Sequence, residues 1–204
     1  MNNQAFRTAQ YLMGAAKLEQ LPPDEGIEVA FAGRSNAGKS SVLNCLTDNK
    51  ALARTSKTPG RTQLINLFQL SDPSKRLVDL PGYGFAKVSR DLKLNWQETL
   101  SAYLEQRACL KGLVLLMDAR HPLKDTDSML AKWSFEGRLA CHVLLNKADK
   151  LGKNDQNKAL FKVRKDLKAI NPDASVQLFS ALKHQGLDTL LEKMHDWFDI
   201  ESLS

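Results

Sequence analysis

The chain has 204 residues, of which 43% are hydrophobic and 25% charged, and it carries a formal net charge of +6. Its apolar residues occur in short runs, far from the roughly 20 in a row that a membrane-spanning helix needs, so we expect no stable membrane insertion. The first residues lack the charged start and apolar core of an export signal. We therefore expect one compact cytoplasmic domain that acts as a monomer.

The basic balance, with a sequence pI of about 9.2, is open to two interpretations. A polyanionic partner would be attracted by such an excess, but nucleotide phosphates and solvated helix faces would also account for it. Basic residues cluster late in the chain, at Lys147, Lys150, Lys153, Lys158, Lys162, Arg164, Lys165 and Lys168. The cluster slightly favours a polyanionic partner, although a solvated helix gives the same pattern.

Strand and helix patterns alternate after an N-terminal segment of 26 residues, which ends in a Pro- and Gly-containing breaker at 21–26. Apolar runs predict strands at 27–33, 63–70, 77–79, 112–118, 141–146 and 175–179. Helical periodicity predicts helices at 39–46, 92–105, 125–135, 155–170 and 187–198. The segment 71–76 is too short for a crossover helix, so its two flanking strands should form an antiparallel hairpin. The pattern predicts a three-layer α/β fold around a six-stranded, mostly parallel sheet.

The most informative motif lies between the first of these strands and the helix that follows it. Its sequence, GRSNAGKS, comprises Gly33, Arg34, Ser35, Asn36, Ala37, Gly38, Lys39 and Ser40. The glycines let backbone N–H groups face a phosphate, Lys39 can reach the β/γ oxygens, and the Ser40 hydroxyl can bind Mg²⁺. The position of the motif between a strand and a helix predicts a phosphate-binding loop for a nucleoside triphosphate.

A second motif follows the apolar pair Leu77-Val78 and consists of Asp79, Leu80, Pro81 and Gly82. The Asp79 carboxylate can hold Mg²⁺ through water, and the Gly82 N–H can contact a γ-phosphate. Such a turn is ordinary loop chemistry when it stands alone. Its place after the phosphate loop is what gives it functional meaning.

A third motif, Asn146, Lys147, Ala148 and Asp149, follows the predicted strand at 141–146. The Asp149 carboxylate can accept two parallel hydrogen bonds from guanine N1–H and the 2-amino group, which adenine cannot supply. Asn146 can support the purine and the neighbouring loop, and the Lys147 stem can lie over the ring. The backbone N–H groups of a later tripeptide could meet guanine O6; its residues are Phe179, Ser180 and Ala181.

These motifs, together with KTPGRTQ at 57–63 and DLPGYGFA at 79–86, resemble the EngB (YihA/YsxC) family of bacterial P-loop GTPases over about residues 8–198. The resemblance implies Mg²⁺-dependent hydrolysis of GTP, assembly of the large ribosomal subunit, and a requirement in cell division and septation. It divides the chain into an N-terminal extension packing on the domain (1–26), a GTP-binding domain (27–199) and a C-terminal tail (200–204).

The resemblance also implies two nucleotide-sensing switches, at 47–62 and 82–88. Thr62 would be the switch threonine and bind Mg²⁺ with Ser40, although the residues alone leave Thr55, Ser56 and Thr58 open. Lys39, Thr62 and Gly82 would act in catalysis. The end of the first switch and the two residues after it would add to the nucleotide site Gly60, Arg61, Thr62, Gln63 and Leu64.

Ras-type GTPases place a glutamine after the DxxG turn to orient the attacking water, but here the next residue is Tyr83. We therefore expect slow intrinsic hydrolysis that a partner or an ion accelerates. Arg61 could supply charge in cis or bind RNA. Asn36 could hold a potassium ion against the phosphates or merely shape the loop.

The resemblance thus implies a GTP-dependent switch that contacts the large ribosomal subunit through its rRNA or proteins. A GTP-regulated interaction module of the division machinery, with no direct RNA contact, is the alternative. A third hypothesis is an ATPase, but Asp149 argues against it because adenine lacks the N–H groups that this carboxylate would bind.

Overall fold

The computed structural model describes residues 3–53, 64–83 and 90–200, with side chains from residue 98 onward in the third range. Its strands are β1 (Gln10–Ala15), β2 (Ile27–Gly33), β3 (Ile65–Gln69), β4 (Lys75–Asp79), β5 (Leu110–Asp118), β6 (Ala140–Asn146) and β7 (Ser175–Leu178). Its α-helices are α1 (Gln4–Arg7), α2 (Lys39–Thr47), α3 (Arg90–Gln106), α4 (Asp125–Glu136), α5 (Lys153–Ile170) and α6 (Leu187–Trp197). Two short 3₁₀ turns, η1 (Leu18–Gln20) and η2 (Ala148–Lys150), complete the described elements.

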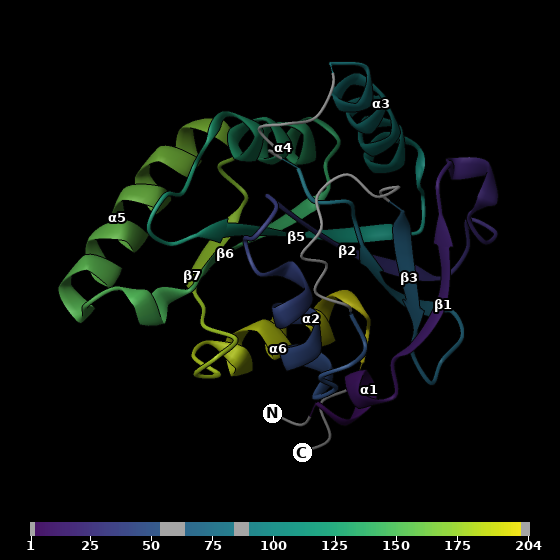
Figure 1. Cartoon of the computed structure of the whole chain (residues 1–204), viewed down its shortest axis with the longest axis horizontal. Coiled ribbons are helices and arrows are strands. Elements are labelled where there is room, and N and C mark those ends of the chain that lie inside the picture. Colours follow the sequence, from purple (N-terminus) through teal and green to yellow (C-terminus); the bar gives the residue numbers. More distant parts are fainter. Residues whose placement is uncertain (1–2, 54–63, 84–89, 201–204) are drawn as a thin grey trace.

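The described strands form one sheet in the order β1-β3-β4-β2-β5-β6-β7 (Figure 1). Strand β2 pairs in parallel with β4 and β5, and β6 and β7 extend the parallel part. Strands β3 and β4 are antiparallel, which confirms the predicted hairpin. The α/β class and the mostly parallel sheet are therefore as predicted.

The predicted count of six strands was wrong, because β1 adds a seventh by pairing antiparallel with β3. Its sequence gives little local signal: Tyr11 and Leu12 are exposed, and the pairing register shifts between Tyr11 and Met13. What defines this strand is hydrogen bonding to a segment at least 50 residues away in the sequence, Ile65–Gln69. No periodicity within the first 26 residues encodes such a partner.

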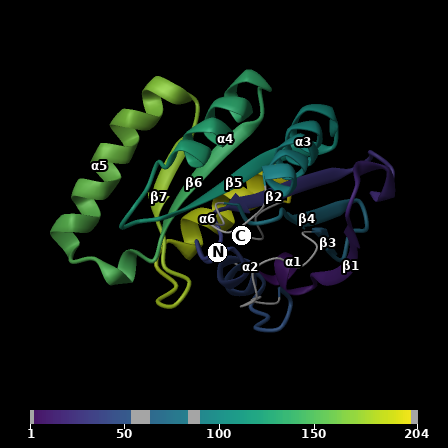
Figure 2. The same cartoon turned by 45° about the horizontal axis from the view of Figure 1, so that its top comes forward.

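The sheet alternates its side chains between two buried clusters, as strands covered on both faces do. Ala30 and Ala32 of β2 face the cluster beneath α3, α4 and α5, whereas Val29 and Phe31 face the cluster beneath α1, α2 and α6. Figure 2 shows these two helix layers on opposite faces of the sheet. The architecture is the three-layer arrangement that the sequence predicts.

The last helix packs on the sheet through the apolar stripe expected for it, since Leu190, Leu191 and Met194 are all buried. Trp133 and Trp197 are partly buried and pack against the core, as expected of packing anchors, and the Trp96 side chain lies outside the described residues. The three cysteines are buried and unpaired. Among the described residues, no helix is long and apolar enough to cross a membrane.

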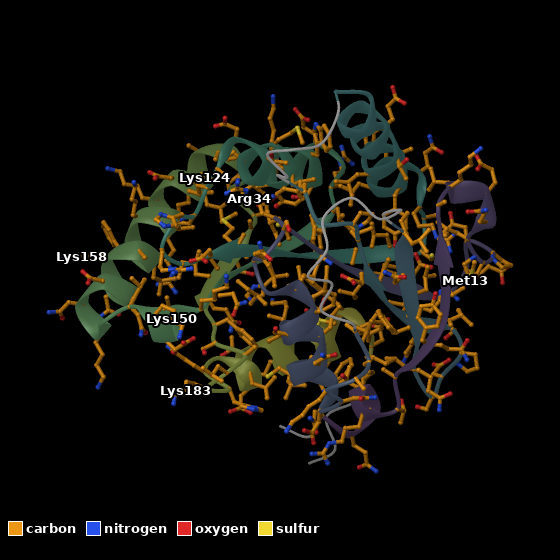
Figure 3. All side chains as sticks on the ribbon, in the orientation of Figure 1. Met13, Arg34, Lys124, Lys150, Lys158 and Lys183 are labelled. Atoms are coloured by element: carbon orange, nitrogen blue, oxygen red, sulfur yellow. The ribbon has the colours of Figure 1, made fainter. Side chains whose placement is uncertain are left out.

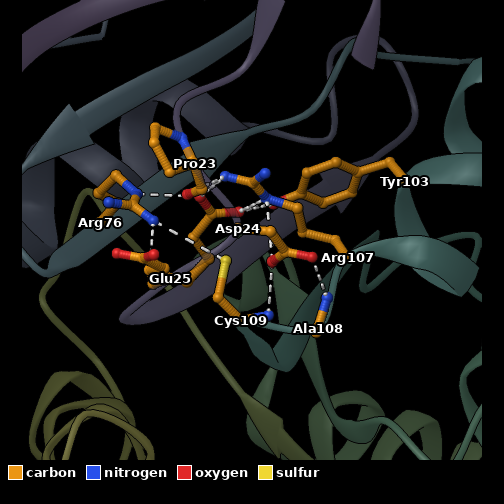
Figure 4. A network of polar contacts seen from close by, with 9 residues as sticks. Pro23, Asp24, Glu25, Arg76, Tyr103, Arg107, Ala108 and Cys109 are labelled. Atoms are coloured by element: carbon orange, nitrogen blue, oxygen red, sulfur yellow. Dashed lines mark hydrogen bonds and ion pairs between the residues drawn. The ribbon is translucent and has the colours of Figure 1, made fainter. Parts of the chain in front are cut away.

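A buried ionic network joins the amino ends of the central strands (Figure 4). Glu28 of β2 is fully buried and accepts hydrogen bonds from Arg76 Nε (2.9 Å), the Tyr103 hydroxyl (2.8 Å) and Arg107 Nη2 (2.7 Å). Asp24 accepts the Cys109 backbone N–H at 2.8 Å. The network ties α3 to β2 and β4 at the edge of the sheet opposite the carboxyl ends of these strands.

Candidate nucleotide-binding site

The phosphate loop begins at the carboxyl end of β2 and leads directly into α2. Gly38, immediately before the helix, has φ 93°, a conformation that favours glycine, and a Cβ there would lie 2.4 Å from Asn146 Nδ2. Gly33 is also constrained, since a Cβ there would lie 3.0 Å from the Leu116 carbonyl oxygen. The first-turn N–H groups of α2 have no acceptor one turn earlier in the helix, which makes its start a favourable anion site.

The first and second motifs meet through an ion pair between Lys39 Nζ and Asp79 Oδ1. Both side chains are largely buried, at 12% and 11% exposure. The contact arises because β2 and β4 are parallel neighbours, with Phe31 paired to Asp79 at the carboxyl end. The two groups expected to bind phosphate and Mg²⁺ are thus adjacent.

The oxygen donors in this corner suit Mg²⁺. Ser40 supplies a hydroxyl and Asp79 a carboxylate, and among the described residues no group of three or more His, Cys, Asp or Glu forms a protein-only metal cage. Mg²⁺ typically takes only one or two protein oxygens and completes its shell with water and substrate phosphates. Ser40 and Asp79 are therefore the described residues that could hold it.

The second motif runs directly alongside the phosphate loop. The Ser35 N–H donates to the Tyr83 carbonyl at 2.7 Å, and the Leu80 N–H donates to the Phe31 carbonyl at 3.0 Å. The backbone of Gly82 packs near Ser35, where an added Cβ would lie 3.5 Å from Ser35 Cα. Leu80 is buried and Pro81 partly buried.

Tyr83 points its ring into the protein interior. Its hydroxyl donates a 2.8 Å hydrogen bond to Oδ1 of Asp127, at the start of α4, and both residues are buried. Burial raises the pKa of both side chains, and the neighbouring Asp127 carboxylate raises that of Tyr83 further. In this position Tyr83 links the second motif to α4 and offers no carboxamide to an attacking water.

The third motif is attached to the phosphate loop by two side chains. Asn146 is buried, and its Nδ2 donates to the Ala37 carbonyl at 2.8 Å. Lys147 extends its ammonium group to the Asn36 carbonyl at 2.5 Å and to Asp118 Oδ2 at 3.1 Å. The motifs expected to read the base and to bind the phosphates are therefore directly joined.

The carboxylate expected to read the base is held by the tripeptide expected beside it. The Ser180 hydroxyl donates a 2.6 Å hydrogen bond to Asp149 Oδ1, and this bond is the main reason why the Asp149 pKa lies below its ordinary value. The backbone N–H groups of Phe179 and Ser180 donate to the carbonyls of Leu145 and Gln185. Three backbone N–H groups are expected near guanine O6. Because those of Phe179 and Ser180 are bonded within the protein, the Ala181 N–H is the candidate for contact with the base.

Sequence reasoning missed Asp118, at the end of β5. Its carboxylate accepts bonds from Lys147 Nζ and from Arg120 Nε (2.9 Å) and Nη2 (2.7 Å), and the Arg120 bonds do most to lower its pKa. The available signal was its position, since a charged residue directly after a buried apolar run lies at the carboxyl edge of a parallel sheet, where ligands bind. Its partner in β6 is Asn146.

Most of the first switch lies outside the described residues. Outside the described ranges lie Gly60, Arg61 and Thr62, the neighbouring Gln63, the alternatives Thr55, Ser56 and Thr58, and 84–88 of the second switch. Leu64 is described and partly buried, with its Cδ1 2.8 Å from where a Cβ on Gly14 of β1 would lie.

Comparison with known proteins identifies the family. A family model described as 50S ribosome-binding GTPase matches residues 28–147. The probable GTP-binding protein EngB of Escherichia coli O157:H7 (strain EC4115 / EHEC) is 54% identical over 199 residues, covering 98% of this chain and 94% of that protein. The chain belongs to the EngB family of GTPases. The EngB of Shigella boydii serotype 18 is 54% identical over 198 residues, covering 97% of this chain and 94% of that protein.

Solved structures agree with this EngB-family fold. The crystal structure of a probable GTP-binding protein engB matches with a TM-score of 0.68 and 20% identity, covering 85% of this chain and 100% of that one. The structure of Era in complex with MgGDPNP and nucleotides 1506–1542 of 16S ribosomal RNA matches with a TM-score of 0.62 and 22% identity, covering 85% of this chain and 57% of that one. At these identities the likeness concerns the fold.

Proposed function

We propose that this EngB-family GTPase binds GTP and GDP with Mg²⁺ in the corner between α2, β4 and the end of β6. The observation that carries the proposal is the pair of bonds from Asn146 and Lys147 to the phosphate loop. They fix the distance between the groups for the base and the groups for the phosphates. Such preorganisation reduces the ordering cost of binding.

Each residue has a distinct role in the proposed site. Backbone N–H groups from Gly33 to Ser40 surround the phosphates, and Lys39 exchanges its partner Asp79 for the β/γ oxygens. The Ser40 and Thr62 hydroxyls would hold Mg²⁺ directly and Asp79 would hold it through water, and the ion would supply positive charge to offset that of the phosphates. The Gly82 N–H contacts the γ-phosphate, and Asp149 reads the guanine edge. The end of the first switch and the two residues after it add Gly60, Arg61, Gln63 and Leu64.

Intrinsic hydrolysis should be slow in this arrangement. Phosphoryl transfer depends on positioned phosphates, a metal and a water held in line, and the residue after Gly82 is Tyr83, whose hydroxyl is bonded to Asp127. Lys39 and the loop amides would stabilise charge on the phosphates without orienting the water. A partner or a monovalent ion would complete the site.

The experiment that tests the nucleotide site is the affinity of wild type and Asp149→Asn for GTP, GDP, ATP and XTP. An amide at Asp149 cannot accept both guanine N–H groups but can donate to the 2-oxygen of xanthine, so selectivity should move from GTP to XTP by at least a hundredfold, about 2.7 kcal/mol. Asp155→Asn, an exposed carboxylate on α5, is the control and should change nothing. Equal binding of ATP and GTP by wild type would overturn the proposal.

We further propose that the protein is a cytoplasmic, GTP-dependent switch in assembly of the large ribosomal subunit. In this role it would be needed for normal cell division and septation. The 50S ribosome-binding description of the matching family model and the net charge of +6 support it. Co-sedimentation with large subunits should require a GTP analogue and weaken with salt. Binding to a division protein in ribosome-free extract, without binding to subunits, would favour the alternative interaction module.

A further inference from the structure

The outer face of α5 combines positive charge with an exposed aromatic ring. The helix carries six basic and two acidic side chains along 18 residues. Phe161, at its middle, is 72% exposed, the largest exposed fraction among the exposed large hydrophobic residues described. At helical spacing, Lys158, Lys165 and Lys168 lie three, four and seven residues from Phe161 and so share its face. We call these four residues the α5 basic face.

The α5 basic face is not used to hold the fold. The helix packs on the sheet through its opposite side, where Val163 and Leu167 are buried. Lys158 is 80% exposed and lies 3.8 Å from the exposed Asp155, a pair of little energetic weight. Lys165 and Lys168 form no ion pair with any acidic residue in the part of the chain that the structure describes. An exposed Phe among them therefore has no packing role.

The face continues toward the proposed guanine site. Gln185 of the loop after β7 donates from Nε2 to Gln156 Oε1 of α5 at 3.1 Å, which joins that loop to the helix. The loop exposes Leu182 (69%), beside Lys183. Figure 3 shows Lys158, Lys150 and Lys183 on the same side of the molecule. A partner on α5 would lie next to the loop that holds Asp149 through Ser180.

We propose that the α5 basic face binds a single-stranded segment of RNA, with an unpaired base stacked on Phe161 and the flanking phosphates paired with Lys158, Lys165 and Lys168. The inference rests on the proposed ribosomal function for the source of that RNA. Aromatic rings accept bases through stacking, and lysines around them neutralise the backbone; this combination is the usual one for single-stranded RNA.

Two other occupants fit the observations less well. A helix lying in a membrane surface buries a continuous apolar side in the lipid, whereas the apolar side of α5 is buried against its own sheet. An acidic protein segment would satisfy the lysines but would not need a ring exposed at their centre. RNA uses both the charge and the ring.

The test measures binding of a fluorescent, mixed-sequence single-stranded RNA of about 12 nucleotides to the full-length protein. Lys158→Gln/Lys165→Gln/Lys168→Gln should reduce the slope of log affinity against log salt by about 2, since each phosphate contact on a single strand contributes about 0.7. Phe161→Ala should weaken binding by at least about fivefold, the lower end for loss of one stacked base.

Matched controls separate this face from general charge and hydrophobicity. Lys17→Gln/Lys111→Gln/Lys132→Gln removes the same charge at exposed sites outside α5 and outside the two proposed switches, and Phe135→Ala removes a 41% exposed ring from α4. Both should bind the RNA like wild type. Equal losses in test and control variants would overturn the proposal, as would stronger binding to anionic phosphatidylglycerol vesicles or a poly-glutamate peptide than to RNA. GTP affinity serves as the folding check.

Large-subunit co-sedimentation of the same variants distinguishes failure of this inference from failure of the proposed function. If the α5 variants lose binding to subunits and to the oligonucleotide, the result supports the RNA-binding face and the ribosomal function. If wild type and α5 variants bind subunits equally well, the inference fails and the ribosomal function stands. If wild type binds no subunits but binds RNA through α5, the inference of an RNA face stands and the ribosomal function fails.

Discussion

Ser180 Oγ donates a 2.6 Å hydrogen bond to Asp149 Oδ1, although 31 residues separate them. The bond exists because β6 and β7 are parallel neighbours, so the segments that follow them leave the sheet side by side. It orients the carboxylate proposed to read guanine and keeps it ionised. In the proposed site, the loop after β7 would therefore act on the base through Asp149 as well as through its own backbone.

Removing this bond should weaken guanine binding. Ser180→Ala should lower GDP affinity by about tenfold, since hydrogen bonds to charged groups contribute roughly 1.5–3 kcal/mol. The folded-state pKa of Asp149 is lowered by this bond, so in the variant it rises and protonation starts at a higher pH as the solution is acidified. NMR titration of the carboxyl group checks the pKa shift. Ser101→Ala, which removes an exposed hydroxyl from α3, is the control; an unchanged Asp149 pKa in Ser180→Ala would contradict the prediction.

Gly38 should tolerate no side chain. Gly38→Ala would hold alanine at a φ of 93° and place its Cβ 2.4 Å from Asn146 Nδ2, which donates to the Ala37 carbonyl. The clash would displace the link between the base and phosphate motifs, so GTP affinity should fall by at least about tenfold. Gly152→Ala is the matched control, because nothing lies within 4 Å of its Cβ position and its φ is −66°. Comparable losses in both variants would argue against a specific constraint at Gly38.

Tyr83 should contribute to stability through its hydroxyl. Tyr83→Phe takes one donor from the buried carboxylate of Asp127, so the free energy of unfolding should fall by about 1–3 kcal/mol. Urea unfolding of Tyr83→Phe and of the control Tyr11→Phe, which changes a 58% exposed ring, measures the difference. The hydrolysis rate should change little, since Tyr83 is not proposed to orient the water; a loss of hydrolysis at full stability would refute this assignment.

Potassium should accelerate hydrolysis if Asn36 helps to hold the ion. Asn36 is exposed in the phosphate loop with φ 66°, and its backbone carbonyl accepts a bond from Lys147, so the side-chain amide oxygen is the group it can offer. Hydrolysis should be several-fold slower in sodium than in potassium at equal ionic strength. In Asn36→Gly, which removes the amide and accepts the φ of 66° without strain, the difference between the salts should disappear while GTP affinity persists. Equal wild-type rates in the two salts would leave Asn36 as a loop-shaping residue.

Local patterns were sufficient to predict the sheet from β2 onward. Strands β2, β5 and β6 are buried on both faces, so each appears as a continuous apolar run. The motifs at Gly33–Ser40, Asp79–Gly82 and Asn146–Asp149 follow directly after such strands, so their positions could be inferred as well. Their side chains converge because consecutive parallel strands end at one edge.

Contacts between distant segments could not be predicted. Strand β1 depends on β3 for its hydrogen bonds, and Asp118 acquires its place in the site only beside Lys147. The Lys39–Asp79 pair and the Tyr83–Asp127 bond likewise join segments that no local periodicity relates. The predictions at Thr62 and Arg61 stay predictions, because these residues lie outside the described ranges.

Among the ionisable residues whose side chains the structure describes, Glu28 should be the one whose replacement costs the most stability. It is fully buried and accepts bonds from Arg76, Tyr103 and Arg107, so Glu28→Gln leaves two guanidinium groups without their buried counter-charge. Breaking a buried pair in this way costs about 3–5 kcal/mol of unfolding free energy. Glu136→Gln, which removes the exposed 3.5 Å pair with Lys132, should cost no more than about 0.5 kcal/mol.

The difference between wild type and Glu28→Gln should depend on pH in a defined direction. Burial alone would raise the pKa of Glu28, but hydrogen bonds from Arg107 and Tyr103 outweigh it and hold the pKa below its ordinary value. A carboxyl group with a lowered native pKa stabilises fully above its unfolded-state pKa, about 4.3, and loses that stabilisation as the pH falls through the native pKa. Urea unfolding from pH 7 to pH 3 should therefore show the gap between the two proteins constant above about pH 5 and narrowing below it. A gap that widens on acidification would mean that burial outweighs the network and that Glu28 is protonated readily in the native state.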